Sequence, residues 1–240
     1  MNKIVSPAQS WIRLAIDSLP SDLLVLRKTY PLGHLMCFQD YVAGPIQRDE
    51  ALLLYALVKT VDPKTIVEFG FDRGHSAINF LKAMSSGSRL YSYDISDVSM
   101  RLSRKIHDKR FRFIFKSQTD FEYSDVDNRL VDLVFFDASH DFHLNVATFE
   151  KVKRCLSERA LIIVHDTGAW YGKLKGLRTP EGYFVDGKAR AGYIHRPDER
   201  RFVNYIRANM EGFDQIHLHS TSKFRHGLTV LQRNVDALPL

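Results

Sequence analysis

Short apolar runs alternate with helical patterns along most of the chain, and this alternation is what most constrains its fold. Apolar residues recur at helical spacing over 76–84, 98–106 and 142–156. Between these stretches lie five short runs rich in β-branched and aromatic residues, which predict strands at Thr65–Phe69, Arg89–Tyr93, Phe111–Phe115, Val131–Phe136 and Ala160–Val164. Strands that alternate with helices pair in parallel through right-handed crossovers, so we expect a doubly wound α/β sheet.

The segments before the first strand depart from this alternation. Trp11–Arg27 and Asp49–Val61 have the amphipathic spacing of helices, with proline and glycine between them. They predict an N-terminal helical extension over residues 1–60, followed by the main domain over residues 61–240.

The end of the chain departs from the alternation as well. Residues 167–197 are rich in glycine and aromatic side chains, a composition that favours a substrate lid over a linker. A helix is expected at Asp198–Met210, and strand-like alternation follows at Phe213–His219 and Gly227–Arg233. Successive strands joined by a short turn are antiparallel, so the sheet should end in an antiparallel hairpin.

The composition is that of an ordinary globular protein, with 45% hydrophobic and 26% charged residues, and it excludes a disordered chain. The two cysteines, Cys37 and Cys155, lack the spacing of a zinc or iron–sulfur site. The net charge of +6 raises the question of nucleic acid, but aromatic side chains do not interleave the basic stretches. We therefore expect neither nucleic acid nor a membrane as a partner. We expect a cytoplasmic location, and we leave open whether the protein forms a homo-oligomer.

A glycine turn follows the first strand. Gly70 and Gly74 stand between that strand and a helix, where a ligand can approach the backbone and the helix start attracts anions. Ser76 is a candidate cap for this helix. The second strand runs into Asp94, an acid placed to accept both hydroxyls of a ribose. The pair indicates a nucleotide-like cofactor; the dinucleotide NAD is one alternative, although Asp72 interrupts the Gly-x-Gly-x-x-Gly pattern that NAD enzymes carry.

Acids also follow the fourth and fifth strands. Asp137 comes directly after the fourth strand, and Asp166 comes after the fifth. Neighbouring parallel strands lie about 4.8 Å apart, so the two carboxylates can converge on one hard cation such as Mg²⁺. His140 and His165 stand beside them, and histidine is the residue type that ordinarily titrates in the range that general-base chemistry needs. The structural alternative is that one acid caps a helix and the other accepts backbone N–H groups.

These motifs resemble those of a known family. Val67-Glu-Phe-Gly-Phe-Asp-Arg-Gly-His-Ser76 resembles motif I of the class I S-adenosylmethionine-dependent methyltransferases, and Tyr91-Ser-Tyr-Asp94 is similar to their ribose-binding strand end. The resemblance covers the chain from Thr65 onward and implies a Rossmann-like, mostly parallel, seven-stranded sheet with an antiparallel C-terminal hairpin. It also implies S-adenosylmethionine as the cofactor, held by Glu68, Gly70, Phe71, Gly74, Ser76, Asp94, Ser117, Gln118 and Asp137, with Ser117 and Gln118 at the adenine.

Within that family the acids resemble those of the metal-dependent O-methyltransferases of the sugar, natural-product and catechol type. The resemblance implies Asp137, Asp166 and Thr167 as ligands of Mg²⁺, although Thr167 stands where an Asn or Asp is usual. His140 takes the place of a catalytic lysine, while His165 is a further candidate as ligand or catalytic group. We therefore expect methyl transfer to a hydroxyl of a small molecule. The alternatives are transfer without a metal, an NAD-dependent oxidoreductase, and a binding module without catalysis.

Overall fold

The computed structural model describes residues 46, 48–167, 198–210, 212–219 and 227–233, together with the backbone at 184–185 and 188–189. The chain divides into two compact units, residues 1–42 and 43–240, and every described residue belongs to the second. The helix expected at residues 11–27 and nearly all of the lid expected at 167–197 lie outside the described residues.

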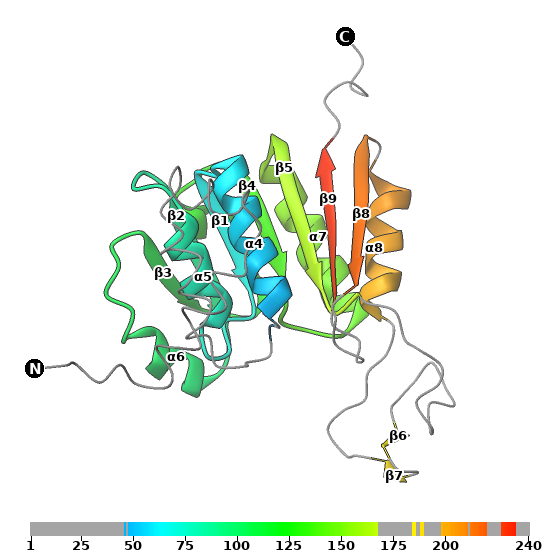
Figure 1. Ribbon diagram of the computed structural model, residues 1–240, viewed down its shortest axis with the longest axis horizontal. Coiled ribbons are helices and arrows are strands. Elements are labelled where there is room, and N and C mark those ends of the chain that lie inside the picture. The colour runs from blue at the N-terminus through cyan, green and yellow to red at the C-terminus, as the bar shows by residue number, and fades with distance from the viewer. Residues whose placement is uncertain are drawn as a thin grey trace, which may run out of the picture. The chain divides into compact units, whose positions relative to one another are not determined.

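One seven-stranded sheet forms the centre of the described unit, in the order β3-β2-β1-β4-β5-β9-β8 (Figure 1). Strands β1 to β5 are parallel, and β9 is antiparallel to both of its neighbours, β5 and β8. The expected sheet and hairpin are thus confirmed. The strands are β1 Thr65–Phe69, β2 Arg89–Asp94, β3 Phe111–Phe115, β4 Val131–Phe136, β5 Leu156–His165, β8 Phe213–His219 and β9 Gly227–Arg233.

Helices cover both faces of this sheet, as the alternation predicts. In Figure 1, α4 and α5 lie in front of the strands, and α7 and α8 lie behind them. The helices are α4 Arg48–Val61, α5 His75–Ala83, α6 Asp97–Ser103, α7 Phe142–Val152 and α8 Asp198–Asn209, with 3₁₀ turns η1 Gln118–Asp120, η2 Tyr123–Val126 and η3 Lys153–Cys155. Two short strands, β6 Phe184–Val185 and β7 Lys188–Ala189, pair separately.

Aromatic side chains fill the two layers between sheet and helices. The Phe80 ring of α5 lies 5.5 Å from that of Phe135, and on the opposite face the Phe202 ring of α8 lies 4.9 Å from that of Phe136. Residues 135 and 136 are neighbours on β4 and therefore point to opposite faces. Both aromatic layers pack against the central strands. This packing fixes the carboxyl ends of β1, β4 and β5 relative to one another.

Several expected boundaries differ from the structure, most of all those between α7 and β5. The helix expected to reach Leu156 ends at Val152, and β5 begins at Leu156 rather than at Ala160. Val152 and Leu156 are both buried, so the apolar spacing continues while the backbone changes from helix to strand. Helix α4, expected in an extension over residues 1–60, belongs to the unit of residues 43–240. None of the described helices is long and apolar enough to cross a membrane.

Candidate active site

The turn between β1 and α5 has the backbone shape that its glycines allow. Gly70 and Gly74 have φ of 102° and 80°, a region that favours glycine, and a Cβ on Gly70 would lie 2.7 Å from the backbone nitrogen of Ala138. Asp72 replaces a third glycine and has φ of 44°, which aspartate tolerates better than most residues. The Phe71 ring is buried beneath the turn against Phe113 rather than pointing to solvent.

Asp94 fastens this turn to the end of β2. Its Oδ2 accepts hydrogen bonds from the backbone nitrogens of Phe71 at 3.1 Å and Asp72 at 2.8 Å, and its Oδ1 accepts one from Ser96 at 2.8 Å. A carboxylate oxygen can accept more than one hydrogen bond, so these contacts are compatible with the expected role at a ribose. Asp94 therefore also shapes the turn, a task that the sequence does not reveal.

Glu68 lies beneath the turn, fully buried, with the Ser76 hydroxyl donating to its Oε1 and the Ser92 hydroxyl to its Oε2. Burial raises the pKa of Glu68 to about 8. The expectation that Ser76 caps α5 is wrong, because the N-cap residue is Gly74 and the Ser76 side chain is bonded to Glu68 instead. The structure thus places Glu68 and Ser76 as supports of the turn.

Replacing Glu68 with glutamine should remove a pH-dependent loss of stability. The unfolded glutamate ionises near 4.5 and the folded one near 8, so its stabilising contribution is complete below 4.5 and is lost as the pH rises towards 8. Glutamine stays neutral in both states and can still bond both serines. We expect the free energy of unfolding of Glu68→Gln, relative to wild type, to rise by roughly 2–4 kcal/mol between about pH 5 and about pH 8.

Urea unfolding across that pH range measures this difference. The exposed Glu158 provides the matched control, since Glu158→Gln should show no such trend. A constant difference between Glu68→Gln and wild type at all pH values would show that Glu68 is ionised in the folded protein.

A cavity of about 350 Å³ opens at the carboxyl end of the sheet, beside the turn. This volume is in the range of small-molecule sites. Many of the residues expected at the cofactor line it. Its lining includes Gly70, Asp94, Ser117, Gln118, Asp137 and Leu144. The structure therefore brings together the glycine turn, the acid at the end of β2 and the predicted adenine residues around one hollow.

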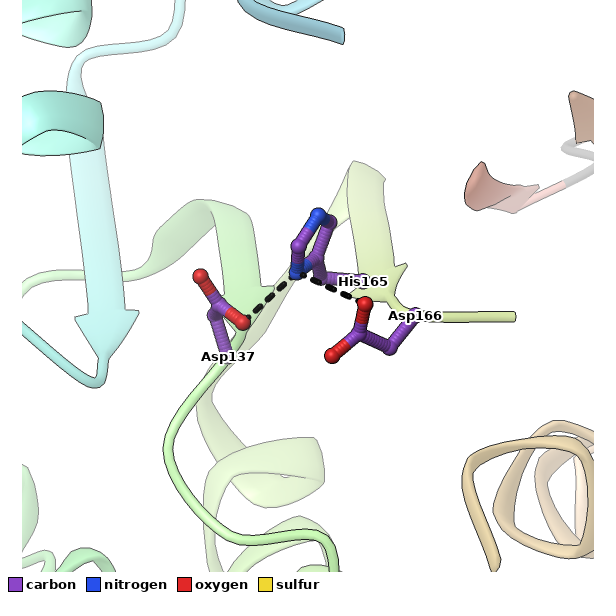
Figure 2. Close-up of side chains that lie close together, drawn as sticks. All are labelled: Asp137, His165 and Asp166. Carbon is purple, nitrogen blue, oxygen red and sulfur yellow. Dashed lines mark hydrogen bonds and ion pairs between the residues drawn. The ribbon is translucent and has the colours of Figure 1, made fainter. Parts of the chain in front are cut away.

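The two predicted acids lie close together with a histidine between them, and one of them, Asp137, lines this cavity. Figure 2 shows the imidazole of His165 lying between the carboxylates of Asp137 and Asp166. Its Nδ1 lies 2.7 Å from Asp137 Oδ1 and 3.6 Å from Asp166 Oδ1, and its Nε2 lies 3.1 Å from Oε2 of Glu50 in α4. Burial lowers the pKa of His165, but the charges of Asp137 and Asp166 and the hydrogen bonds outweigh it and raise that pKa well above its usual value.

A second histidine lies on the other side of Asp166. His140 Nδ1 is 2.6 Å from Oε1 of Glu199 in α8 and 3.9 Å from Asp166 Oδ2. The side chain of His140 is 38% exposed, whereas that of His165 is 3% exposed. Of these two histidines, His140 is therefore the one that a substrate can reach without rearrangement. Asp137 does not cap α7, because the N-cap residue of that helix is Asp141.

Thr167 does not join this cluster. Its hydroxyl accepts a hydrogen bond from Thr229 at 2.7 Å, and its backbone nitrogen donates to Gly227 at 3.2 Å, so both contacts tie it to β9. Within the described residues, the groups whose ligand atoms lie within 4.8 Å of one another are Asp137, His165 and Asp166, and His140, Asp166 and Glu199. A metal at the acids would therefore use a histidine where the sequence expected Thr167.

Glu50 and Glu199 are the site residues that the sequence did not reveal. Each stands in the first turn of a helix, where an acid is ordinarily explained by the helix dipole. Each is buried at 3% exposure and bonded to a histidine far away in sequence. An acid on the apolar face of an amphipathic helix, in its first turn, is the one sequence signal that could have marked them.

Comparison with known proteins agrees with this geometry. Residues 67–167, which hold the glycine turn and both acids, match the family described as a methyltransferase domain. Over this stretch the chain is similar to a methyltransferase domain. No curated protein matches it in sequence.

Solved methyltransferase structures share the fold. The O-methyltransferase of Bacillus cereus, in complex with S-adenosylhomocysteine (SAH), is 19% identical over 84% of this chain and 89% of its own, with a TM-score of 0.61. TomG of Streptomyces achromogenes, in complex with S-adenosylmethionine, is 15% identical over 83% and 86%, with a TM-score of 0.58. SAH-bound PaMTH1 of Podospora anserina is 15% identical over 98% and 100%, with a TM-score of 0.57. These structures confirm the expected fold, and the family match over residues 67–167 agrees with the expected class, an S-adenosylmethionine-dependent methyltransferase.

Proposed function

We propose that this methyltransferase transfers a methyl group from S-adenosylmethionine to a hydroxyl of a small molecule. One observation carries the proposal. Asp137 lines the cavity beside the glycine turn, and its carboxylate also belongs to the cluster with His165 and Asp166. One end of a methyl donor bound in the cavity would therefore lie next to the polar groups that are suited to activating an acceptor.

The cavity fits the cofactor on its own structural features. A Cβ at Gly70 would collide with the backbone after β4, so the glycine keeps the turn close against that strand end. Asp94 presents a carboxylate for the ribose, and Gln118 presents a buried amide oxygen that accepts no hydrogen bond within the described residues. An exocyclic amine is the kind of donor that such an oxygen lacks. When bound, S-adenosylmethionine would supply an electrophilic methyl group on a sulfonium.

His140 is the group suited to take the proton of the acceptor hydroxyl. Glu199 accepts the hydrogen bond of the Nδ1–H, so the lone pair of the neutral ring lies on Nε2. Glu199 thereby fixes both the tautomer and the orientation of the ring. A positioned base of this kind contributes about 10²- to 10⁴-fold to a rate. The acceptor oxygen would take the methyl group as its proton passes to Nε2 of His140, and S-adenosylhomocysteine would leave with the electrons of the broken sulfur–carbon bond.

A divalent cation such as Mg²⁺ fits the acid cluster. Asp137, Asp166 and His165 would hold it, with the cation in place of the proton on Nδ1 of His165, because their ligand atoms all lie within 4.8 Å of one another. Two carboxylates with an imidazole form a donor set that several divalent metals accept. A bound cation would stabilise the oxyanion of the acceptor.

Removing one acid should weaken cation binding. Mn²⁺ serves as a probe, and its binding to the full chain can be followed by electron paramagnetic resonance without knowledge of the substrate. We expect Asp166→Asn to weaken Mn²⁺ binding by more than about tenfold, because carboxylates are the main ligands of hard cations and this change removes one of two. Asp120→Asn, which changes an exposed acid outside the cluster, should leave it unchanged. If wild-type protein does not bind Mn²⁺, the proposed cation site is wrong, and methyl transfer would depend on His140 without a metal.

Calorimetric titration of the full chain with SAH and with NAD tests the function itself. We expect SAH to bind and NAD to fail, because the turn and cavity resemble those of methyltransferases. Binding of NAD alone would overturn the proposal in favour of an oxidoreductase. Binding of SAH without turnover of any hydroxylated acceptor would favour a non-catalytic module.

A further inference from the structure

Two amides and a carbonyl form a buried chain beneath the cavity. The Nδ2 of Asn145, on α7, donates to the backbone oxygen of Ser139 at 2.8 Å. The Oδ1 of Asn145 accepts from Nε2 of Gln118 at 3.0 Å. Asn145 is 2% exposed and Gln118 is 7% exposed, so water reaches neither amide readily. Gln118 and Ser139 both line the cavity.

The carbonyl of Ser139 fixes the direction of every bond in this chain. A carbonyl can only accept, so Asn145 must present its NH₂ group to it and its oxygen to Gln118. Gln118 must in turn present its NH₂ group to Asn145. The remaining atom, Oε1 of Gln118, is buried and accepts no hydrogen bond from any residue that the structure describes. The unpartnered acceptor therefore belongs to a residue that lines the cavity, and the opposite amide orientation would break the bond to Asn145.

An acceptor at this point discriminates between purines. Gln118 follows β3 at the edge of the sheet, whereas Asp137 follows β4 at its centre, beside the acid cluster. With the methyl group at the acids, the purine lies on the side of Gln118. A purine with a 6-amino group donates to Oε1, but a 6-oxo purine would set one acceptor against another. A buried acceptor left without a donor costs about 1–3 kcal/mol.

We propose that Asn145 is a positioning residue which fixes the amide of Gln118 and so selects a cofactor with a 6-amino purine over one with a 6-oxo purine. This inference rests on the proposed function, because it requires the S-adenosyl group in the cavity. It adds the residue that determines purine specificity, although that residue is not among those lining the cavity.

Titration of the full chain with SAH and with S-inosylhomocysteine, its 6-oxo analogue, measures the preference directly. Wild-type protein should prefer SAH by about 10- to 100-fold, the ratio that corresponds to one unsatisfied buried acceptor. In Asn145→Ala the amide of Gln118 can turn over, so the preference should fall below about threefold through weaker SAH binding and tighter binding of the analogue. A residue with only a structural role would weaken both ligands alike and leave their ratio unchanged.

Two further variants sharpen the test. Asn145→Asp keeps an acceptor opposite Nε2 of Gln118 and should keep the preference. Thr148→Val removes a buried hydroxyl from the same helix, one that donates to the Leu144 carbonyl and not to Gln118, and should also keep it. If Asn145→Ala does not fold, Asn145→Ser gives the same comparison with a smaller loss of packing.

The outcomes separate this inference from the proposed function. Equal binding of the two ligands by wild type, or a full preference retained in Asn145→Ala, would overturn the role of Asn145 while S-adenosyl binding stands. Binding of neither ligand by wild type would defeat the proposed function and this inference together.

Discussion

Replacing His140 with glutamine should lower the rate of methyl transfer by about 10²- to 10⁴-fold, the contribution of a positioned general base. Affinity for SAH should change by less than about threefold, because His140 is not among the residues that line the cavity. The rate is measured as release of SAH with an acceptor chosen from a panel of hydroxylated small molecules, and the affinity by calorimetry.

A matched histidine lies close by. His143 is exposed on α7, so His143→Gln should leave the rate within about twofold of wild type, as surface changes usually do. Glu199→Gln should also lower the rate, because the ring of His140 loses the buried charge beside it and the carboxylate that fixes its tautomer. Full activity in His140→Gln, or an equal loss in His143→Gln, would contradict the assignment of the base.

Replacing Gly70 with alanine should abolish SAH binding and destabilise the fold. The added Cβ would lie 2.5 Å from the carbonyl carbon of Asp137 and 2.7 Å from the nitrogen of Ala138, so backbone rather than a flexible side chain must move. The φ of 102° is also a conformation that alanine rarely adopts. Together these should lower the free energy of unfolding by about 3–5 kcal/mol, in the range of the largest single-residue effects. Urea unfolding and SAH titration measure the two consequences.

Gly87 provides the control for this change. A Cβ at Gly87 would meet no atom within 4 Å, so Gly87→Ala should alter neither stability nor SAH affinity appreciably. A Gly70→Ala protein that folds and binds SAH like wild type would show that β1 and the strand end after β4 are not held as close together as the structure has them.

The local pattern of the chain was enough to predict most of the fold. The run of β-branched and aromatic residues in Val131–Phe136 and the alternating pattern of Phe213–His219 predicted strands where the structure has them. The motif around Gly70 and Gly74 located the turn, since its backbone shape depends on the glycines themselves. Asp137 and Asp166 could be expected to meet, because parallel strands end at the same edge of the sheet.

What the sequence could not determine is which side chains meet across packed elements. Glu50 reaches His165 from α4 and Glu199 reaches His140 from α8, and these contacts depend on how two helices pack on opposite faces of the sheet. The same holds for Thr167, which β9 draws away from the acids through Thr229. Residue types and spacing act over a few positions, whereas the direction of a buried hydrogen bond is decided by neighbours that only the folded chain brings together.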